Sequence, residues 1–215
     1  MTSLDVESLF TNVPVGKMIG IIMERVYRNP NMRPPNIPED SLRTLLDICT
    51  KRVPFTTYRD QMYCQKDGVA MGSPLRVLFA NFYMGEVEDR VFSQHRCPHT
   101  YRRYIDDIFA QANSEDKVEA LRQQLLQHRA LNFTIEYCSN DRLPFLDVLV
   151  TKMNQKLATT VYTKATNFGL CLNGDSECPV RFKTTTVTAF VRRALLHYST
   201  WQDTPQTRPS IPDTN

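Results

Sequence analysis

The stretch Tyr101–Phe109, YRRYIDDIF, decides the fold prediction because it places two carboxylates side by side within an apolar segment. Adjacent like charges repel, and burial of the Asp106 or Asp107 carboxylate without a partner costs a large desolvation free energy. The short apolar arms on both sides predict a β-hairpin with the carboxylates at its tip. Either the pair lies in a turn exposed to water, or a cation lies between it and the rest of the fold.

The composition is that of an ordinary globular protein. The chain has 215 residues, of which 41% are hydrophobic and 23% charged, enough for one large domain or two small ones. Its net charge of +3 permits a polyanionic partner without requiring one. Polar residues follow Met1 directly, and no apolar run approaches the length of a membrane span. We therefore expect an intracellular protein with no membrane partner.

The six cysteines are scattered and form no C-x-x-C pair. His95, Cys97 and His99 form an H-x-C-x-H pattern that raises the question of a zinc site. We prefer a polar loop that precedes a strand, because no second cluster of ligands is evident. Reduced thiols in an intracellular compartment fit this usage.

Hydrophobic periodicity predicts an α+β fold. The strands and helices do not alternate strictly, which favours a sheet covered by helices on one face. Ser114 is the expected N-cap of the clearest helix. The expected helices cover 14–29, 41–51, 74–92, 114–128 and 186–198; the expected hairpins cover 54–65 and 100–112; the expected single strands cover 2–6, 131–137, 143–151 and 156–164.

A third carboxylate lies in the first predicted strand, where Leu4 and Val6 share one face and Asp5 points the other way. If this strand neighbours the carboxylate hairpin, three acids converge at one edge of the sheet. Oxygen-only ligands favour Mg²⁺, and two such ions about 4 Å apart would stabilise the attacking and leaving oxygens of a phosphoryl displacement. The alternative is a solvated Asp-Asp turn and an unrelated surface aspartate.

Several boxes of the sequence resemble those of reverse transcriptases. YIDD matches their Y-x-D-D box, and DVESLF resembles their first catalytic box. GVAMGSPL looks like their second box, in which a Gly-Ser-Pro or Gly-x-Pro turn opens a helix. LPFLDVLV and TTVYTKATN look like the stretches that follow the Y-x-D-D hairpin in one group of these polymerases. Taken together, the boxes are similar to those of Penelope-like retroelement polymerases. The boxes keep the family's order from Leu4 to about Arg193. The resemblance implies a right-hand polymerase palm with an antiparallel sheet, followed by the start of a helical thumb.

The resemblance also implies roles for individual residues. Asp5 and Asp106 would hold two Mg²⁺ ions, or Mn²⁺ in their place, with Asp107 as a less direct third carboxylate and the carbonyl of Val6 as a further ligand. Phe10 would lie beneath the sugar of the nucleotide and exclude a 2′-hydroxyl. Core packing is the alternative role for this ring.

The turn of the second box and the hairpin would contact substrate. Gly72, Ser73 and Pro74 would shape a turn where backbone approaches template and nucleotide closely, although an ordinary loop that enters a helix has the same composition. Tyr104 and Ile105 would touch the primer end or the nucleotide.

Basic residues late in the chain would contact the nucleic-acid backbone. Arg192 and Arg193 would suit a thumb-like helix that grips the duplex, with a solvated helix face as the ordinary alternative. Lys152 and Lys164 are further candidates for phosphate contacts. For Asp147, within LPFLDVLV, we expect a structural role.

We interpret the chain as an RNA-directed DNA polymerase domain that acts on an RNA template, a DNA primer and deoxynucleoside triphosphates. The resemblance implies action in the nucleus. The expected divisions are a palm at 1–165, a connection and thumb start at 166–198, and a disordered tail at 199–215.

Three departures from the resemblance lead us to expect a truncated copy or an incomplete gene model. The upstream fingers are missing, and Arg76 and Val77 replace the usual Ser-Pro of relatives. Many relatives also end in a GIY-YIG endonuclease domain, whereas this sequence ends in a polar tail. The alternatives are an inactive remnant that at most binds nucleic acid and, from another class, a metal-dependent phosphatase or nuclease.

Overall fold

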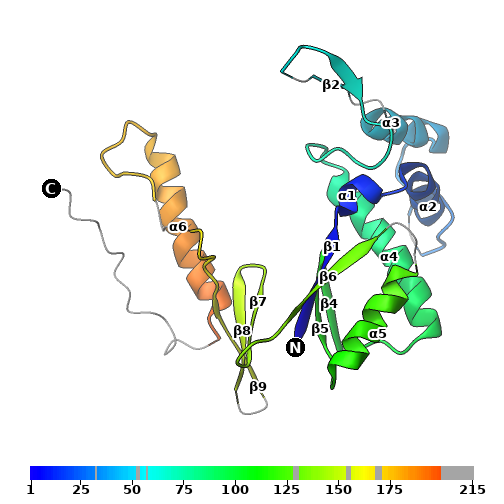
Figure 1. Cartoon of the computed structure of the whole chain (residues 1–215). Coiled ribbons are helices and arrows are strands. Elements are labelled where there is room, and N and C mark those ends of the chain that lie inside the picture. Colours follow the sequence, from blue (N-terminus) through cyan, green and yellow to red (C-terminus); the bar gives the residue numbers. More distant parts are fainter. Residues whose placement is uncertain are drawn as a thin grey trace. The chain divides into compact units, whose positions relative to one another are not determined.

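The computed structural model describes residues 1–31, 33–51, 54–56, 58–127, 131–153, 156–167 and 171–199. The chain divides into two compact units, one formed by Thr2–Ile135 and the other by Met1 and the residues from Glu136 onward. Figure 1 labels the elements of both. All but the first residue of the predicted tail at 199–215 lie outside the described residues.

The described part of the first unit combines a four-stranded sheet with five helices and a separate hairpin, so the predicted α+β class is confirmed. The sheet has the strand order β4-β5-β1-β6, and a second sheet pairs β2 with β3. The bounds are β1 Thr2–Glu7, α1 Leu9–Asn12, α2 Val15–Tyr27, α3 Glu39–Lys51, β2 Pro54–Thr56, β3 Met62–Cys64, α4 Arg76–Gln94, β4 Thr100–Tyr104, β5 Asp107–Gln111, α5 Glu115–Leu126 and β6 Asn132–Tyr137.

The alternation in β1 fixes which face of the sheet is buried. Leu4 and Val6 are 1% and 2% exposed, whereas Asp5 between them is exposed. In the antiparallel pairing of β1 with β5, Leu4 lies opposite Ile108, which is also fully buried. Each such side chain contributes about 1.5–3 kcal/mol when it is removed from water. Any slip by one residue would turn this apolar face outward, so the core sets the register.

Helices α2, α4 and α5 supply the other half of this core. The buried side chains of these helices recur at helical spacing, as expected from the sequence. Those with 3% or less exposure are Met18, Ile19 and Met23 of α2, Phe79, Ala80, Met84, Val87 and Val91 of α4, and Leu125 of α5. Ser114 occupies the N-cap of α5 as predicted, but its side chain makes no capping hydrogen bond.

The second unit contains a three-stranded sheet of order β7-β8-β9 and one long helix. Its elements are β7 Arg142–Phe145, β8 Val148–Met153, β9 Lys156–Val161 and α6 Val180–His197. The prediction of one strand at 143–151 is wrong, because Phe145 pairs with Val148 across a two-residue turn. Leu146 has a φ of 55° there, and no glycine or asparagine in the sequence signals the turn.

No helix among the described residues is both long and apolar enough to cross a membrane.

Candidate active site

The pairing of β1 with β5 brings the predicted carboxylates together. Asp5 lies directly opposite Asp107 in the register, and the backbone N–H of Val6 donates to the carbonyl of Asp106 at 3.2 Å. Residues that lie directly opposite each other in such a pair have Cβ atoms about 5 Å apart on the same face. Since Leu4 and Val6 are buried on the other face, Asp5 and Asp107 project away from the hydrophobic core.

This arrangement is electrostatically unfavourable for Asp5. Partial burial raises the pKa of its carboxyl above 3.8, and the charges of Asp106 and Glu7 raise it further. The backbone of Val6 acts in the opposite direction through a hydrogen bond. Carboxylates held opposite one another on adjacent strands destabilise a sheet unless something compensates them. A cation between Asp5 and Asp106 would relieve this repulsion.

We expect Asp5→Asn to stabilise the protein in the absence of divalent cations. Because the folded state raises the pKa of Asp5, ionisation of this carboxyl lowers stability as the pH rises from 3.8 through the folded pKa, and the loss persists above it. The variant should therefore unfold at a higher temperature than wild type at pH 7 with EDTA, and the gain should shrink toward pH 4. Thermal unfolding at both pH values measures this. A variant that is less stable than wild type at pH 7 would contradict the assigned repulsion.

The turn that carries Asp106 has an unusual backbone. Tyr104 pairs with Asp107, which leaves a two-residue loop of Ile105 and Asp106. Ile105 has a φ of 59°, a region that β-branched residues adopt only under strain. Its side chain packs against the core, which holds the residue in this conformation. Strained residues of this kind cluster at functional sites, where the surrounding structure fixes them.

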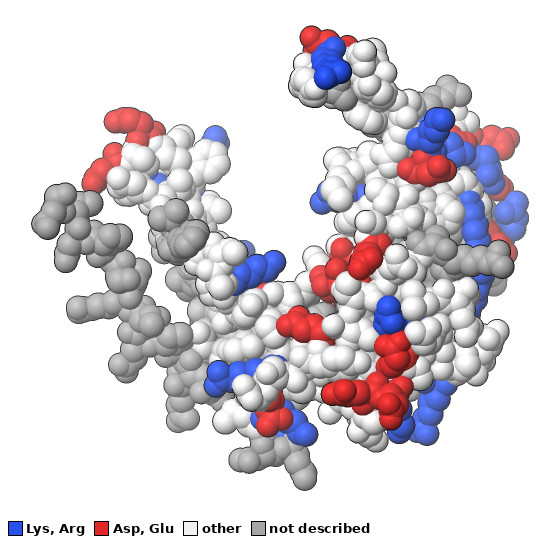
Figure 2. Space-filling view, in the orientation of Figure 1, with Lys and Arg blue, Asp and Glu red and all other residues white. Residues whose placement is uncertain are grey.

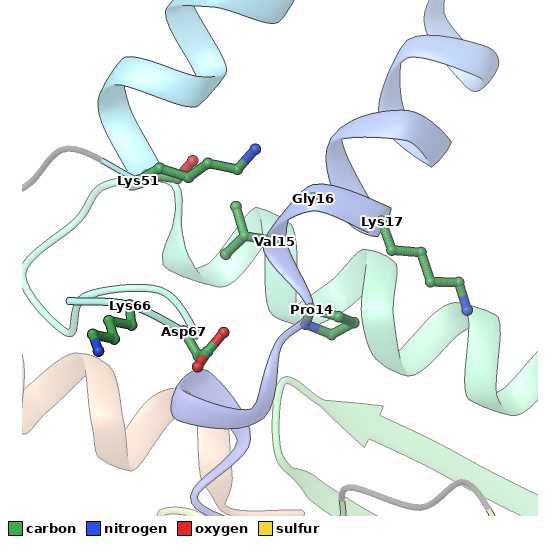
Figure 3. Close-up of a pocket in the computed structure, with 9 residues that line it drawn as sticks. Pro14, Val15, Gly16, Lys17, Lys51, Lys66 and Asp67 are labelled. Carbon is green, nitrogen blue, oxygen red and sulfur yellow. The ribbon is translucent and has the colours of Figure 1, made fainter.

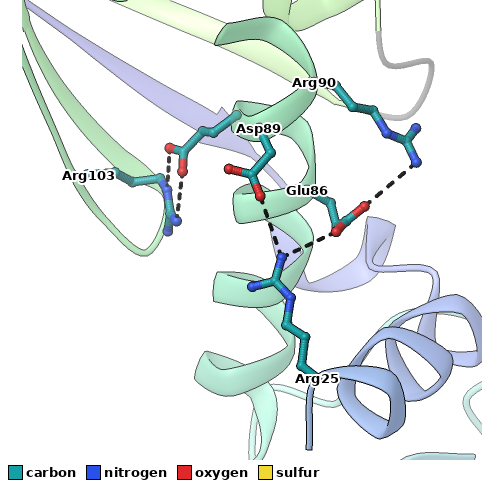
Figure 4. A network of polar contacts seen from close by, with 6 residues as sticks. Arg25, Glu86, Asp89, Arg90 and Arg103 are labelled. Carbon is teal, nitrogen blue, oxygen red and sulfur yellow. Dashed lines mark hydrogen bonds and ion pairs between the residues drawn. The ribbon is translucent and has the colours of Figure 1, made fainter. Parts of the chain in front are cut away.

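An ion pair between β4 and α4 stabilises the turn that carries Asp106. The guanidinium of Arg103 donates from Nε to Glu88 Oε1 at 2.6 Å and from Nη2 to Glu88 Oε2 at 3.1 Å (Figure 4). Its Nη1 donates to Asn81 at 2.7 Å and to the carbonyl of Ile105 at 3.1 Å. Tyr101 also donates its hydroxyl to Glu88 at 2.7 Å. Arg103 therefore fixes the strained residue next to Asp106.

Phe10 lies at the start of α1, half-buried against the core. Its carbonyl accepts a hydrogen bond from Val69 at 2.7 Å, which ties the loop after β3 to this box. Gly68 is required there, since its φ is 73° and a Cβ would meet the Cα of Thr11 at 2.5 Å. Gly68 was not among the predicted site residues, although the GVAMGSP stretch begins with it.

The Gly72–Pro74 turn leads into α4 as predicted. The hydroxyl of Ser73 accepts a hydrogen bond from the backbone N–H of Leu75 at 3.2 Å, within the turn that precedes α4. A Cβ at Gly72 would meet no atom within 4 Å in the described part of the chain. The packing of the described residues therefore does not require a glycine at position 72, and the space beside Gly72 is open.

Arg76 folds back over the first box. Its guanidinium lies 5.6 Å from the centroid of the Phe10 ring and also donates to the carbonyl of Met71. The resemblance places a nucleotide sugar on this ring, so the side chain of Arg76 competes for the same surface.

The remaining predicted contact residues are divided between the two units. Tyr104 is 60% exposed beside the carboxylate turn. Arg192 and Arg193 belong to the second unit, where Arg192 is exposed and Arg193 donates to Asp147 at 2.9 Å and to the carbonyl of Tyr162 at 2.6 Å. This ion pair gives Asp147 the structural contact that we expected. Lys152 and Lys164, also in the second unit, are exposed.

The residues of the site fit a magnesium ion only in part. Carboxylate and carbonyl oxygens are the ligands that Mg²⁺ prefers, and Asp5, Asp106 and Val6 offer them. Within the described ranges, no group of three or more His, Cys, Asp or Glu side chains is arranged to hold an ion. Mg²⁺ usually takes one or two protein carboxylates and completes its shell with water and substrate phosphates. An ion held by these residues would therefore need further ligands from water or from a bound phosphate.

Comparison with known proteins yields structural neighbours only. No family model matches the chain, and no curated protein matches it. The structure of apo telomerase from Candida tropicalis, truncated from its C-terminal domain, has a TM-score of 0.53 at 12% identity and covers 73% of this chain and 34% of that one. Telomerase from Candida albicans, in complex with the TWJ fragment of telomeric RNA, has a TM-score of 0.57 at 11% identity and covers 88% of this chain and 33% of that one.

The chain thus spans about a third of the length of the telomerase chains that it matches. Identities this low show the fold alone. Telomerase is related to reverse transcriptases, so the conclusion is that this chain has a reverse-transcriptase-like fold.

Proposed function

We propose that this chain is the palm and thumb start of an RNA-directed DNA polymerase of the Penelope-like type. The observation that carries the proposal is the β1–β5 register, which sets Asp5 opposite Asp107 and beside Asp106 at the strained turn. The order of the sequence boxes and the shared fold with telomerase support it.

In this proposal the carboxylates of Asp5 and Asp106 hold the divalent ions, and Asp107 contributes negative charge from the opposite strand. Two bound Mg²⁺ ions would stabilise charge on the attacking 3′-oxygen and on the departing pyrophosphate. Phe10 carries the sugar and disfavours ribonucleotides by steric exclusion. The open space at Gly72 admits the nucleotide or the template base.

The partners are an RNA template, a DNA primer and deoxynucleoside triphosphates. One of the matching telomerase structures contains a fragment of telomeric RNA, and we extend nucleic-acid binding to this chain. Arg192 is exposed and available for the phosphate backbone, whereas Arg193 would first have to leave Asp147. Action in the nucleus follows from the retroelement assignment.

The direct test is primer extension on an RNA template with Mg²⁺ and the four deoxynucleotides. We expect incorporation that stops when EDTA removes the metal and returns with Mg²⁺ or Mn²⁺, since divalent ions supply the positive charge that stabilises the attacking and leaving oxygens. Gel analysis of a labelled primer measures it. Incorporation that persists in EDTA, or no incorporation under any metal condition, would contradict the proposal.

A second candidate is a non-catalytic remnant that retains the fold and binds nucleic acid. The position of Arg76 over Phe10 favours it, because the guanidinium covers the ring on which the sugar would lie. Salt-dependent RNA binding without incorporation in the same reactions would select this candidate.

A further inference from the structure

The β2–β3 hairpin exposes a concentration of apolar and aromatic side chains. All six residues of its two strands are exposed, and the turn between them carries Tyr58 at 87% exposure. The hairpin projects from the first unit (Figure 1). Exposed apolar patches in a globular protein can mark binding surfaces.

The rings of the hairpin are arranged as a stacking surface. Phe55 and Tyr63 lie directly opposite each other in the register, with ring centroids 5.8 Å apart and an interplanar angle of 22°. They are 50% and 45% exposed, so part of each ring is open to a further stacking partner. At the tip, the guanidinium of Arg59 lies 5.2 Å from the centroid of the Tyr58 ring.

A pocket lined partly by lysines lies where the hairpin joins the rest of the unit. It has a volume of about 300 Å³, and its charged lining residues are Lys17, Lys51, Lys66 and Asp67. The side chains of Lys17 and Lys66 extend in opposite directions, on either side of the pocket (Figure 3). Lys51 pairs with Asp47 at 2.5 Å. Among the described residues, Lys17 and Lys66 form no ion pair.

Charge in this region favours an anion. The segment 51–67 contains four Lys or Arg residues against two Asp. In the space-filling view, the hairpin shows charge mainly near its tip, with uncharged surface below it (Figure 2). An uncharged aromatic surface next to a cationic pocket matches bases and phosphates, respectively.

A loop links the pocket to the box that contains Phe10. Gly68 lines the pocket and packs against the backbone of Phe10 and Thr11. The next residue, Val69, donates to the carbonyl of Phe10, so the loop from the hairpin runs from the pocket to the first catalytic box.

We propose that the β2–β3 hairpin and the pocket at its base bind single-stranded nucleic acid, with bases stacked on Phe55, Tyr63 and Tyr58 and phosphates near Lys17 and Lys66. A positively charged groove combined with exposed aromatic rings is the general means of binding single strands without sequence preference. In the polymerase proposed above, on which this assignment of the occupant rests, the strand is the unpaired template before it reaches the active site.

The test measures binding of labelled single-stranded RNA, single-stranded DNA and duplex DNA by fluorescence anisotropy, without nucleotides. Phe55→Leu combined with Tyr63→Leu should weaken single-strand binding about tenfold or more, since each base–ring stack contributes about 1–3 kcal/mol. Tyr63→Phe and Tyr58→Phe keep the rings and should bind as wild type does. Unchanged single-strand binding by the double Leu variant, or an equal loss for duplex, would overturn the proposal.

The charge arm uses the salt dependence of the same binding. The logarithm of the binding constant falls linearly as the logarithm of the salt concentration rises. Lys17→Gln and Lys66→Gln should each make this slope less negative by about 0.7, the value for one phosphate contact on a single strand. Lys117→Gln, exposed on α5, is the matched control and should leave the slope unchanged. Equal slopes for all three variants would overturn the pocket's role.

The two proposals fail separately because this assay needs no catalysis. Ring-dependent binding without primer extension would refute the polymerase alone. Extension with a ring-independent affinity would refute the hairpin surface alone.

Discussion

Asp106→Asn should reduce primer extension by more than about 100-fold while leaving the fold intact. Loss of an outer partner of a metal ligand commonly costs 10- to 100-fold in activity, so loss of a direct ligand should cost more. The substitution keeps the size of the side chain and removes one charge next to Asp5. Single-turnover incorporation on an RNA template measures the loss.

The fold should tolerate Asp106→Asn because the residue lies in a turn and is only half-buried. We expect an unchanged or slightly higher unfolding temperature, since repulsion with Asp5 is removed. Glu24→Gln, an exposed acid on α2, is the matched control for loss of one negative charge and should retain full incorporation. Wild-type incorporation by Asp106→Asn would contradict the assigned role.

Glu88→Gln should lower the free energy of unfolding by about 2–3 kcal/mol. The variant leaves the guanidinium of Arg103 without its anionic partner, and the two side chains are only 13% and 16% exposed. Removal of one member of a buried ion pair costs about 3–5 kcal/mol. Because both side chains of this pair are still partly exposed to water, we expect a loss at or just below the lower end of that range. Incorporation should also fall, because Arg103 positions the carbonyl of Ile105.

Glu86→Gln on the same helix is the matched control for this prediction. Glu86 pairs with Arg25 at 3.3 Å and with Arg90 at 3.7 Å, and both arginines are about half exposed (Figure 4). Surface pairs of this kind contribute about 0–1 kcal/mol each. Urea unfolding of both variants should separate them clearly. Equal losses would mean that the Arg103 pair is no more important than its surface neighbours.

The elements around the candidate site could be predicted because their patterns are local and regular. The alternation of Leu4, Asp5 and Val6 gives the strand and its buried face, and the apolar arms around Asp106 give the hairpin. The pairing of these two segments is a long-range contact that no local pattern specifies. Only the order of the boxes pointed to it, and the structure confirms the pairing itself.

The features that the sequence did not predict depend on contacts between distant residues. The turn at Leu146 lacks the usual glycine or asparagine, and its continuous apolar pattern is typical of a single strand. No local pattern identifies the acid that pairs with Arg103, and only the packing of α4 against β4 brings Glu88 to it. Gly68 is required by the backbone of Thr11, which lies 57 positions earlier in the chain.

The central claim is that Asp5 and Asp106 share one divalent-ion pocket, and Mn²⁺ binding followed by electron paramagnetic resonance tests it most directly. Titrations with a deoxynucleotide present would compare wild type, Asp5→Asn, Asp106→Asn and the double variant. If the two carboxylates act together, each single variant should lose most of the binding and the double variant little more, since groups that act as a unit are not additive. Undiminished Mn²⁺ binding in either single variant, or losses that simply add, would contradict the shared pocket.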